Sequence, residues 1–375
     1  MLTYKVTTTL DEFMKLEQAW NELIVNSEVD HAFMKHQWFA ELIKAHHFES
    51  SLSIITVWAD GLLAAAAPIH RSPVVFRKIR VKGLSFLASD LTPRVNFIAS
   101  DPALVAILVK YLLKLEGWDV FVAKNMEEQI ETTRKFLELL GSHLGKYSCQ
   151  IVRGFHSPYL ITEGSWDDYW NELPPQRRNY LNRMCLRRLK KARSYEINRV
   201  TTPGAFKAFL KDMFEISRKS WKSDTHDHLT ADSPQGQLYI NFTPIGLEQG
   251  WVTVYTIRIN NEFIGFEYLL SCNNRYSLVR CDYNNDYRYY SPGNSLRIAI
   301  LKDLFSKPET CEYDMGGNEE AYKLEWCPNI RKHVTVTLGN RNIKGGTIMF
   351  AKNMVLPFLR KLKGSFRDNT GVEKP

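Results

Sequence analysis

The chain has 375 residues, of which 44% are hydrophobic and 24% are charged, and its formal net charge is +8. A chain of this length and composition folds into globular domains, most simply two, so general disorder is excluded. The positive charge favours an anionic ligand, but it does not choose between nucleic acid, anionic lipid and a phosphorylated small molecule.

The sequence carries no targeting or metal-binding signal. The N-terminus lacks the basic and apolar regions of a secretory signal, and no apolar run reaches the roughly eighteen residues of a membrane span. The six cysteines form no C-x-x-C pair and have no histidine partner at zinc spacing (Cys149, Cys185, Cys272, Cys281, Cys311 and Cys327). We therefore expect a cytoplasmic protein with unpaired thiols and no metal site.

Hydrophobic periodicity predicts the elements of the first half. An amphipathic helix covers residues 10–24, with Asp11 as its cap, and a second helix covers 35–46. Two strands then meet at Asp60-Gly61, a dipeptide suited to a tight hairpin. The remaining predicted elements are strands at 83–89 and 94–100, a helix from Asp101 to about Leu115, a strand at 118–123, a helix at 127–141 and a strand at 147–153.

The second half repeats this order. A basic helix follows Pro174-Pro175, and a second helix covers 205–221. A three-stranded meander spans 251–283, with turns at Asn260-Asn261 and Asn273-Asn274. A helix at 294–305, a strand at 311–315 and a last strand at 333–339 complete the half.

The shared order predicts two copies of one mixed α/β unit, each with a mostly antiparallel mixed sheet flanked by helices. We place the first unit at 1–153, the second at 154–345 and a basic tail at 346–375. The tail either docks on the second unit or lies at a membrane surface.

Ser291, Pro292, Gly293, Asn294 and Ser295 begin a helix directly after a strand and a loop. Free backbone N–H groups at such a helix start bind phosphate, and glycine allows close approach. The same residues are also an ordinary helix start.

Two carboxylates lie within the predicted strands. Glu267 falls in an apolar strand, where burial raises a carboxyl pKa towards that of a general acid or base. Asp282 is the alternative on the next strand, although Arg280 beside it indicates an ordinary ion pair. The sequence leaves open which of them contacts a substrate.

The basic helix is either a solvated face or a guide for an anionic ligand, for which arginine is well suited. Arg177 and Arg178 are its candidate ligand-binding residues. His226 and His228, two residues apart among acids, predict an exposed loop near an acceptor site rather than a metal site.

Several segments together resemble the BcsL/CelD-like acetyltransferases, the tandem-domain branch of the GNAT acyltransferases related to the FemAB-type peptidoglycan aminoacyltransferases. The segments are "AWNEL", "HAFMKHQWFAELI", "VWADGLLAAAAPIH", "RRNYLNRMCLRRLKK", "LEQGWVTVYTIRINNEFIGFEYLL", "YRYYSPGNSL" and above all "YDMGGNEEAYKLEW". The resemblance implies two tandem GNAT folds, with the second binding acetyl-CoA or a longer acyl-CoA beside Gly293.

The resemblance also assigns substrate contacts to Asp314, Asn318 and Trp326. Asn318 stands where the family commonly has glycine, so we expect it to take the left-handed conformation. Single-domain GNATs bind pyrophosphate with a glycine-rich loop, and Gly293 is the one glycine of such a loop in this segment. An acyl carrier protein or an aminoacyl-tRNA therefore stays open as the donor.

The expected reaction transfers an acyl group from a thioester to an amine, or a hydroxyl, of an envelope or exopolysaccharide precursor. Glu267 or Asp282 would be the base, with backbone N–H groups near Asp282 as oxyanion donors. Tyr322 would protonate the leaving thiolate, and Lys323 would hold a phosphate or stabilise negative charge.

Three alternatives remain: an aminoacyl-tRNA donor, a long-chain N-acyl lipid product, and a non-catalytic scaffold that binds glycan or lipid. The expected partner is a small or lipid-linked acceptor, with peripheral contact at the inner membrane face. Nucleic acid is expected only as tRNA under the first alternative.

Overall fold

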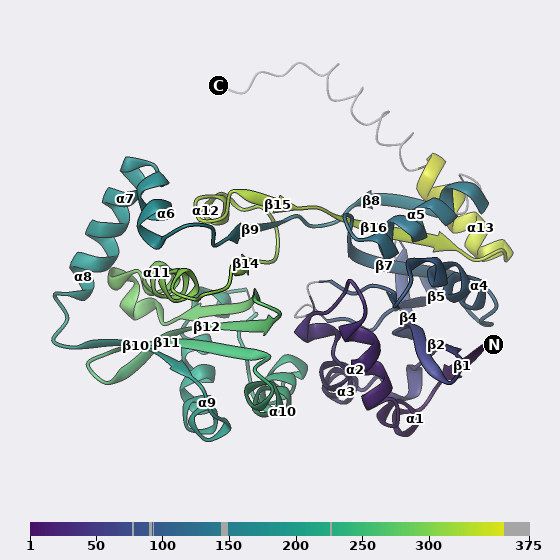
Figure 1. Cartoon of the computed structure of the whole chain (residues 1–375), viewed down its shortest axis with the longest axis horizontal. Helices are drawn as coiled ribbons and strands as arrows, with labels where there is room; N and C mark the ends of the chain where they lie inside the picture. The colour runs from purple at the N-terminus through teal and green to yellow at the C-terminus, as the bar shows by residue number, and fades with distance from the viewer. Residues whose placement is uncertain (77–78, 90–91, 93, 144–148, 226, 356–375) are drawn as a thin grey trace, which may run out of the picture.

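The protein consists of two α/β halves lying side by side (Figure 1). The computed structural model describes residues 1–76, 79–89, 92, 94–143, 149–225 and 227–355. The helices of the N-terminal half are α1 (Leu10–Met14), α2 (Glu17–Val25), α3 (His36–Ala45), α4 (Val105–Leu112) and α5 (Glu131–His143). Those that follow are α6 (Trp166–Glu172), α7 (Pro175–Leu181), α8 (Arg187–Leu189), α9 (Pro203–Arg218), α10 (Pro234–Glu248), α11 (Pro292–Phe305), α12 (Ala321–Leu324) and α13 (Ile343–Phe350).

One continuous sheet forms the centre of the C-terminal half. Its strand order is β10-β11-β12-β13-β14-β9-β15, and β13 and β14 are its parallel neighbours. Helices α9 and α10 pack on one face, and α11 packs on the other. The strands are β10 (Tyr195–Val200), β11 (Val252–Ile259), β12 (Glu262–Cys272), β13 (Arg275–Tyr283), β14 (Glu312–Asp314), β9 (Ser157–Ile161) and β15 (Asn329–Arg331).

The N-terminal half has the same succession, interrupted at Pro68, where β3 ends and β4 begins. Its two sheets have the orders β1-β2-β3-β6 and β4-β5-β7-β16-β8, and β5 and β7 are parallel. The strands are β1 (Leu2–Thr7), β2 (Ile54–Ala59), β3 (Leu62–Ala67), β4 (Ile69–Phe76), β5 (Ile79–Phe86), β6 (Ile98–Ala99), β7 (Val120–Glu127), β8 (Cys149–Arg153) and β16 (His333–Gly339). Each half therefore contains one parallel strand pair in a mostly antiparallel arrangement, and the predicted fold class is confirmed.

A two-stranded ribbon crosses from one half to the other. Residues 149–161 run antiparallel to residues 329–339, with Leu338 opposite Cys149 in the N-terminal half and Asn329 opposite Tyr159 in the C-terminal half. We call this pair of segments the crossing ribbon. The strand at 333–339 was expected in the second unit, but it lies between β7 and β8 of the first. Side-chain alternation reveals a strand without revealing its partner, so the sequence could not show this exchange.

Local turn chemistry explains several other elements. Asp60, Asn260, Asn261, Asn273 and Asn274 all have positive φ, as the predicted hairpin turns require. The predicted helix at 10–24 is instead two helices, α1 and α2, and Thr9 rather than Asp11 caps the first.

Helix α10 was missed because Pro244 lies inside it, and proline ordinarily ends a helix. Tertiary packing supports this helix, because Phe242 meets Trp38 of α3 edge to face, with 4.9 Å between the ring centres. The contact also ties the two halves together.

Within the described part of the chain, no helix is both long and apolar enough to cross a membrane. The six cysteines are free, and the described residues contain no His, Cys, Asp and Glu cluster suited to a metal. His226 and residues 356–375 of the predicted tail lie outside the described residues. The start of the tail forms most of α13, where Met349 is fully buried and Phe350 is exposed.

Candidate active site

The parallel strands β13 and β14 separate where the candidate site opens. Their last paired residues are Ser277 and Asp314, after which β14 ends and β13 continues to Tyr283. Pairing with β12 also shifts around Val279, which forms a bulge. The backbone N–H groups on this side of β13 therefore have no partner strand and can reach a ligand, whereas the Cys281 carbonyl accepts a hydrogen bond from the Lys222 ammonium at 2.9 Å.

A cavity of about 1000 Å³ lies beside this opening. Its C-terminal wall comes from residues 278–281 of β13, the start of α11 and the turn at 316–317. Its opposite wall comes from the N-terminal half, including Ser85 of β5 and Lys124 of β7. The volume is at the upper end for small-molecule sites, which leaves room for two substrates.

The predicted phosphate-binding residues form the N-terminus of α11. Ser291 adopts the left-handed conformation with φ 48°, and Pro292 is the first helical residue. Ser291, Gly293 and Asn294 line the cavity, whereas Pro292 and Ser295 are buried behind them. The nearest atom to a side chain added at Gly293 would be the Cys281 sulfur, at 3.9 Å, so the helix start is open to a ligand.

Glu267 is completely buried and bound to groups that reach the cavity. Its carboxylate pairs with Arg297 and accepts a hydrogen bond from the Tyr313 hydroxyl at 3.1 Å. Burial raises the pKa of Glu267, and the charge of Arg297 opposes this rise. Arg297 and Cys281 line the cavity, and Cys281 lies opposite Glu267 on the neighbouring strand β13. Glu267 therefore does not line the cavity itself, but residues next to it do.

Asp282 is an ion-pair partner behind the cavity wall. The Lys222 ammonium lies 2.6 Å from one of its oxygens, and Arg280 Nε lies 2.7 Å from the other. Both cations line the cavity, whereas Asp282 is 2% exposed and does not. The arrangement matches the ordinary ion pair that the sequence indicated.

Tyr322 and Lys323 both line the cavity. The Tyr322 side chain is half exposed, and partial burial, with the charge of Glu320, raises the pKa of its hydroxyl to about 12. The hydroxyl is therefore protonated at neutral pH and able to donate a proton. The buried Lys323 ammonium donates to the Gly316 carbonyl at 2.8 Å and pairs with Glu320 at 2.6 Å. Lys323 thus fastens the glycine turn as well as bringing positive charge to the cavity.

The turn itself differs from the prediction. Gly316 and Gly317 take the left-handed conformation, with φ 56° and 60°, whereas Asn318 has no positive φ. The expectation that Asn318 replaces a left-handed glycine is wrong, because the two preceding glycines already make the turn. Asn318 is exposed and does not line the cavity.

Replacing Gly317 by alanine should impair both the fold and the activity. The added Cβ would lie 2.6 Å from the Lys323 ammonium nitrogen, at a φ that L-residues rarely adopt. We expect a loss of about 1–3 kcal/mol in the free energy of unfolding, measured in urea, together with lower transferase activity. Gly346→Ala is the control, because a Cβ added there would meet no atom within 4 Å beyond its own stretch of helix. Equal stability of the two variants would contradict the role of this turn.

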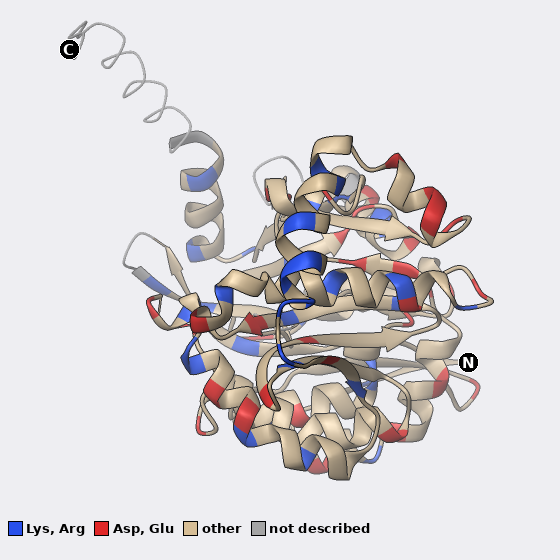
Figure 2. Cartoon of the chain, turned by 90° about the vertical axis from the view of Figure 1, so that its left-hand side faces the viewer, with Lys and Arg blue, Asp and Glu red and all other residues tan. Residues whose placement is uncertain are grey.

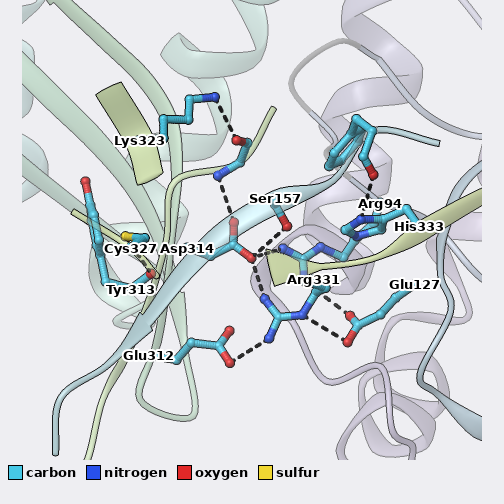
Figure 3. Close-up of polar contacts among 12 residues, drawn as sticks. Arg94, Glu127, Ser157, Glu312, Tyr313, Asp314, Lys323, Cys327, Arg331 and His333 are labelled. Carbon is cyan, nitrogen blue, oxygen red and sulfur yellow. Dashed lines mark hydrogen bonds and ion pairs between the residues drawn. The ribbon is translucent and has the colours of Figure 1, made fainter. Parts of the chain in front are cut away.

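Asp314 lies in a buried ion cluster between the two halves (Figure 3). Arg94 and Arg331 both lie 2.5 Å from the same oxygen, Oδ2. The Gly316 N–H donates to the other oxygen, Oδ1, at 2.7 Å. Burial alone would raise the carboxyl pKa, but the two arginine charges outweigh this and lower the pKa of Asp314 to about 2. Asp314 therefore supports the turn from behind instead of lining the cavity.

Sequence reasoning missed the partners of Asp314. Arg331 also binds Glu127 of β7 at 3.0 Å and Glu312 of β14 at 2.7 Å, and Arg94 binds Glu127 at 3.2 Å. Arg94 and Asp314 are 220 positions apart in the chain. No local pattern marks contacts at such a separation.

The basic helix lies beside the start of α11. It consists of α7, a π-helical turn at Asn182–Leu186 and α8, and Figure 2 shows bands of Lys and Arg along its outward face. Arg177 reaches Asn294 at 3.4 Å and lies over the ring of Trp326. Trp326 is a core residue, 1% exposed, and Arg178 contacts Asn171 rather than the cavity. Of these three predicted substrate-binding residues, Arg177 therefore comes nearest to the helix start.

Comparison with known proteins agrees with this geometry. Residues 176–324 match the family model described as an acetyltransferase (GNAT) domain. No curated protein matches the chain in sequence. The solved structure of FemX is similar over 87% of this chain and 96% of its own, with a TM-score of 0.54 and 13% identity.

Two further structures have the same TM-score of 0.54. One is the C-terminal domain of a putative lysylphosphatidylglycerol synthetase from Agrobacterium fabrum, at 11% identity over 91% of this chain and 96% of that one. The other is a conserved protein of unknown function from Bacteroides thetaiotaomicron, at 10% identity over 90% of this chain and 100% of that one. These likenesses concern the fold. Residues 176–324 thus match a GNAT acetyltransferase domain, and the chain shares its fold with FemX.

Proposed function

We propose that this protein transfers an acyl group from acyl-CoA, or a similar thioester, to an amine of a cell-envelope or polysaccharide precursor. The observation that carries this proposal is the cavity on which the separated strands β13 and β14 and the N-terminus of α11 converge. This arrangement lies within the residues that match the acetyltransferase domain. The finer resemblance to BcsL/CelD-like enzymes favours an exopolysaccharide precursor as the acceptor, and a hydroxyl acceptor is the less favoured form of the same reaction.

The donor fits the C-terminal wall. The N–H groups at Gly293 and Asn294 suit a pyrophosphate, and Arg288, which also lines the cavity, adds positive charge nearby. The thioester carbonyl would then lie along the open edge of β13, where unpaired N–H groups stabilise the developing oxyanion.

Glu267 and Tyr322 are the residues near this edge that would transfer protons. Glu267 is the better base, because burial raises its pKa and Cys281, which lies opposite it on β13, lines the cavity. Asp282 is paired with two cations, whereas Glu267 is paired with Arg297 alone. Tyr322 would donate its proton to the leaving thiolate, because its hydroxyl is protonated at neutral pH and lines the cavity.

The direct test is a panel of acyl-CoAs of increasing chain length, each offered with amino sugars and long-chain amines. Thiol release and a matching mass gain on the acceptor would support the proposal, and the preferred chain length separates acetyl transfer from long-chain lipid acylation. Absence of transfer from every thioester would overturn it. A scaffold would bind ligand equally well after replacement of Lys323 or Glu267.

Asn294→Asp should weaken donor binding without unfolding the protein. A carboxylate at a helix N-terminus suits the helix dipole but repels a phosphate. The new side chain keeps an oxygen for Arg177, which now contacts the Asn294 amide oxygen at 3.4 Å. We expect the KM for acyl-CoA to rise about tenfold with an unchanged melting temperature, measured by initial rates and calorimetry. An unchanged KM would remove α11 from the donor site.

A second candidate is an aminoacyl-tRNA donor. It is favoured by the bands of Lys and Arg along the basic helix (Figure 2) and by the fold shared with FemX. Binding to such a surface weakens steeply as salt increases, because each phosphate contact releases counterions. A tRNA titration at several salt concentrations tests this, and a salt-independent or undetectable affinity would exclude it.

With a lipid-linked acceptor, the reaction would take place at the inner face of the membrane, and the protein would contact that surface.

A further inference from the structure

The N-terminal half contains its own strand opening, and this opening faces the same cavity. The parallel strands β5 and β7 are paired up to Ser85 and Val122, after which β5 ends at Phe86 and β7 continues. Ser85, Phe86 and Val122 all line the cavity. The N-terminal wall is therefore built like the donor wall opposite, although it lies outside the residues that match the acetyltransferase domain.

A bulge on β7 directs polar side chains into this wall. Pairing with β16 shifts between Ala123 and Met126, so that Lys124 and Asn125 together oppose Thr335. Asn125 has φ 53°, and its N–H donates to the Thr335 hydroxyl at 3.2 Å. Bulges and left-handed non-glycine residues inside strands are costly, and they occur where a side chain is re-aimed beside a functional site.

The adjacent segment at Gly154 and Phe155 leaves room for this bulge. The Asn125 amide oxygen accepts the N–H of Phe155, and it would lie 3.0 Å from a side chain added at Gly154. Lys124 is exposed, lines the cavity and has no ion-pair partner among the described residues. None of the described residues that line this wall carries a carboxylate. Asp227 also lines the cavity, but it belongs to the C-terminal half.

We propose that the bulge at Lys124 and Asn125 binds the acceptor, and that the acceptor carries an anionic group, a phosphate or a carboxylate, which pairs with Lys124. This inference rests on the proposed function, because it assigns the second substrate to the wall that faces the donor. The acceptor amine would point across the cavity to the open edge of β13. A cationic acceptor is disfavoured, because this wall offers an ammonium and no acid.

The test uses the full chain saturated with CoA and three matched amino sugars: glucosamine, glucosamine 6-phosphate and muramic acid. Calorimetric titration should show that an anionic sugar binds about tenfold more tightly than glucosamine, because one charge-assisted hydrogen bond contributes about this much. The phosphate and carboxylate arms show which anion is preferred. In Lys124→Gln the preference should fall below about twofold, and in Lys124→Arg it should remain.

Lys82→Gln is the matched control, since Lys82 is an exposed lysine of β5 that does not line the cavity. Equal binding of charged and neutral sugars, no binding of any of them, or a preference that survives Lys124→Gln would overturn the inference. Weaker CoA binding in Lys124→Gln would also overturn it, because Lys124 would then belong to the donor site. Failure of the wild-type chain to bind CoA or acetyl-CoA would instead count against the proposed function, and the sugar titrations repeated without CoA would still decide the role of Lys124.

Discussion

Tyr322→Phe should lower kcat by about 100-fold to 1000-fold and leave the KM for acyl-CoA and the melting temperature nearly unchanged. The hydroxyl is the proposed proton donor to the leaving thiolate, and loss of a positioned general acid costs a factor of this size. The side chain is half exposed, so removal of one oxygen should not disturb the packing. Because the pKa of Tyr322 is raised to about 12, deprotonation of this group should not reduce the rate up to pH 10.

The matched control is Tyr289→Phe. Tyr289 is similarly exposed, precedes α11 and does not line the cavity, so its variant should keep wild-type rates. Pre-steady-state measurement of thiol release would separate the chemical step from product release. A Tyr322→Phe enzyme with more than half of the wild-type kcat would assign the proton donor to another group or to water.

Asp314→Asn should lower the free energy of unfolding by about 3–5 kcal/mol, because it leaves the buried Arg94 and Arg331 without their shared carboxylate. The amide oxygen can still accept the Gly316 N–H, so the loss isolates the charge. Urea unfolding of the wild type, Asp314→Asn and the exposed control Asp286→Asn measures the effect. A loss below about 1 kcal/mol would show that Glu127 and Glu312 alone neutralise the arginines.

The pH dependence of this loss has a definite sign. The pKa of Asp314 is lowered to about 2, below its ordinary value of 3.8, so its stabilising contribution is fully present above about pH 4. The contribution is lost as the pH falls through the pKa of the folded state. The stability difference between the wild type and Asp314→Asn should therefore shrink between pH 4 and pH 2, whereas a difference that grows on acidification would contradict the ion pairs.

The sequence predicted the features that depend on neighbouring residues. The Asn-Asn hairpins, the helix start at Ser291-Pro292-Gly293 and the buried position of Glu267 all follow from local turn chemistry and strand alternation. It could not predict what depends on distant contacts. Neither Lys124 nor Arg94 belongs to a recognisable motif, and each acquires its place through a strand or ion-pair partner about 200 residues away.

The role of a single residue was also hard to predict from the sequence, because it depends on the groups that surround that residue in the fold. Asp314 was expected to touch substrate because it stands in "YDMGGNEEAYKLEW", the segment that carries most of the family resemblance, and it ends β14 as predicted. Its Oδ2 is nevertheless taken by groups from three other parts of the protein, and its Oδ1 accepts the Gly316 N–H. Whether a carboxylate is free for chemistry is thus a property of the fold rather than of its neighbours in sequence.

The crossing ribbon has a mechanical consequence. A flexible linker would let the halves rotate about a hinge, but here each half contains a ladder strand whose continuation is hydrogen-bonded into the other. Separating the halves would bend the crossing ribbon and pull Arg94 away from Asp314, so the two halves should unfold together in one cooperative transition. We therefore expect the distance between the two cavity walls to be set by the fold and not by a lid that closes around the substrates.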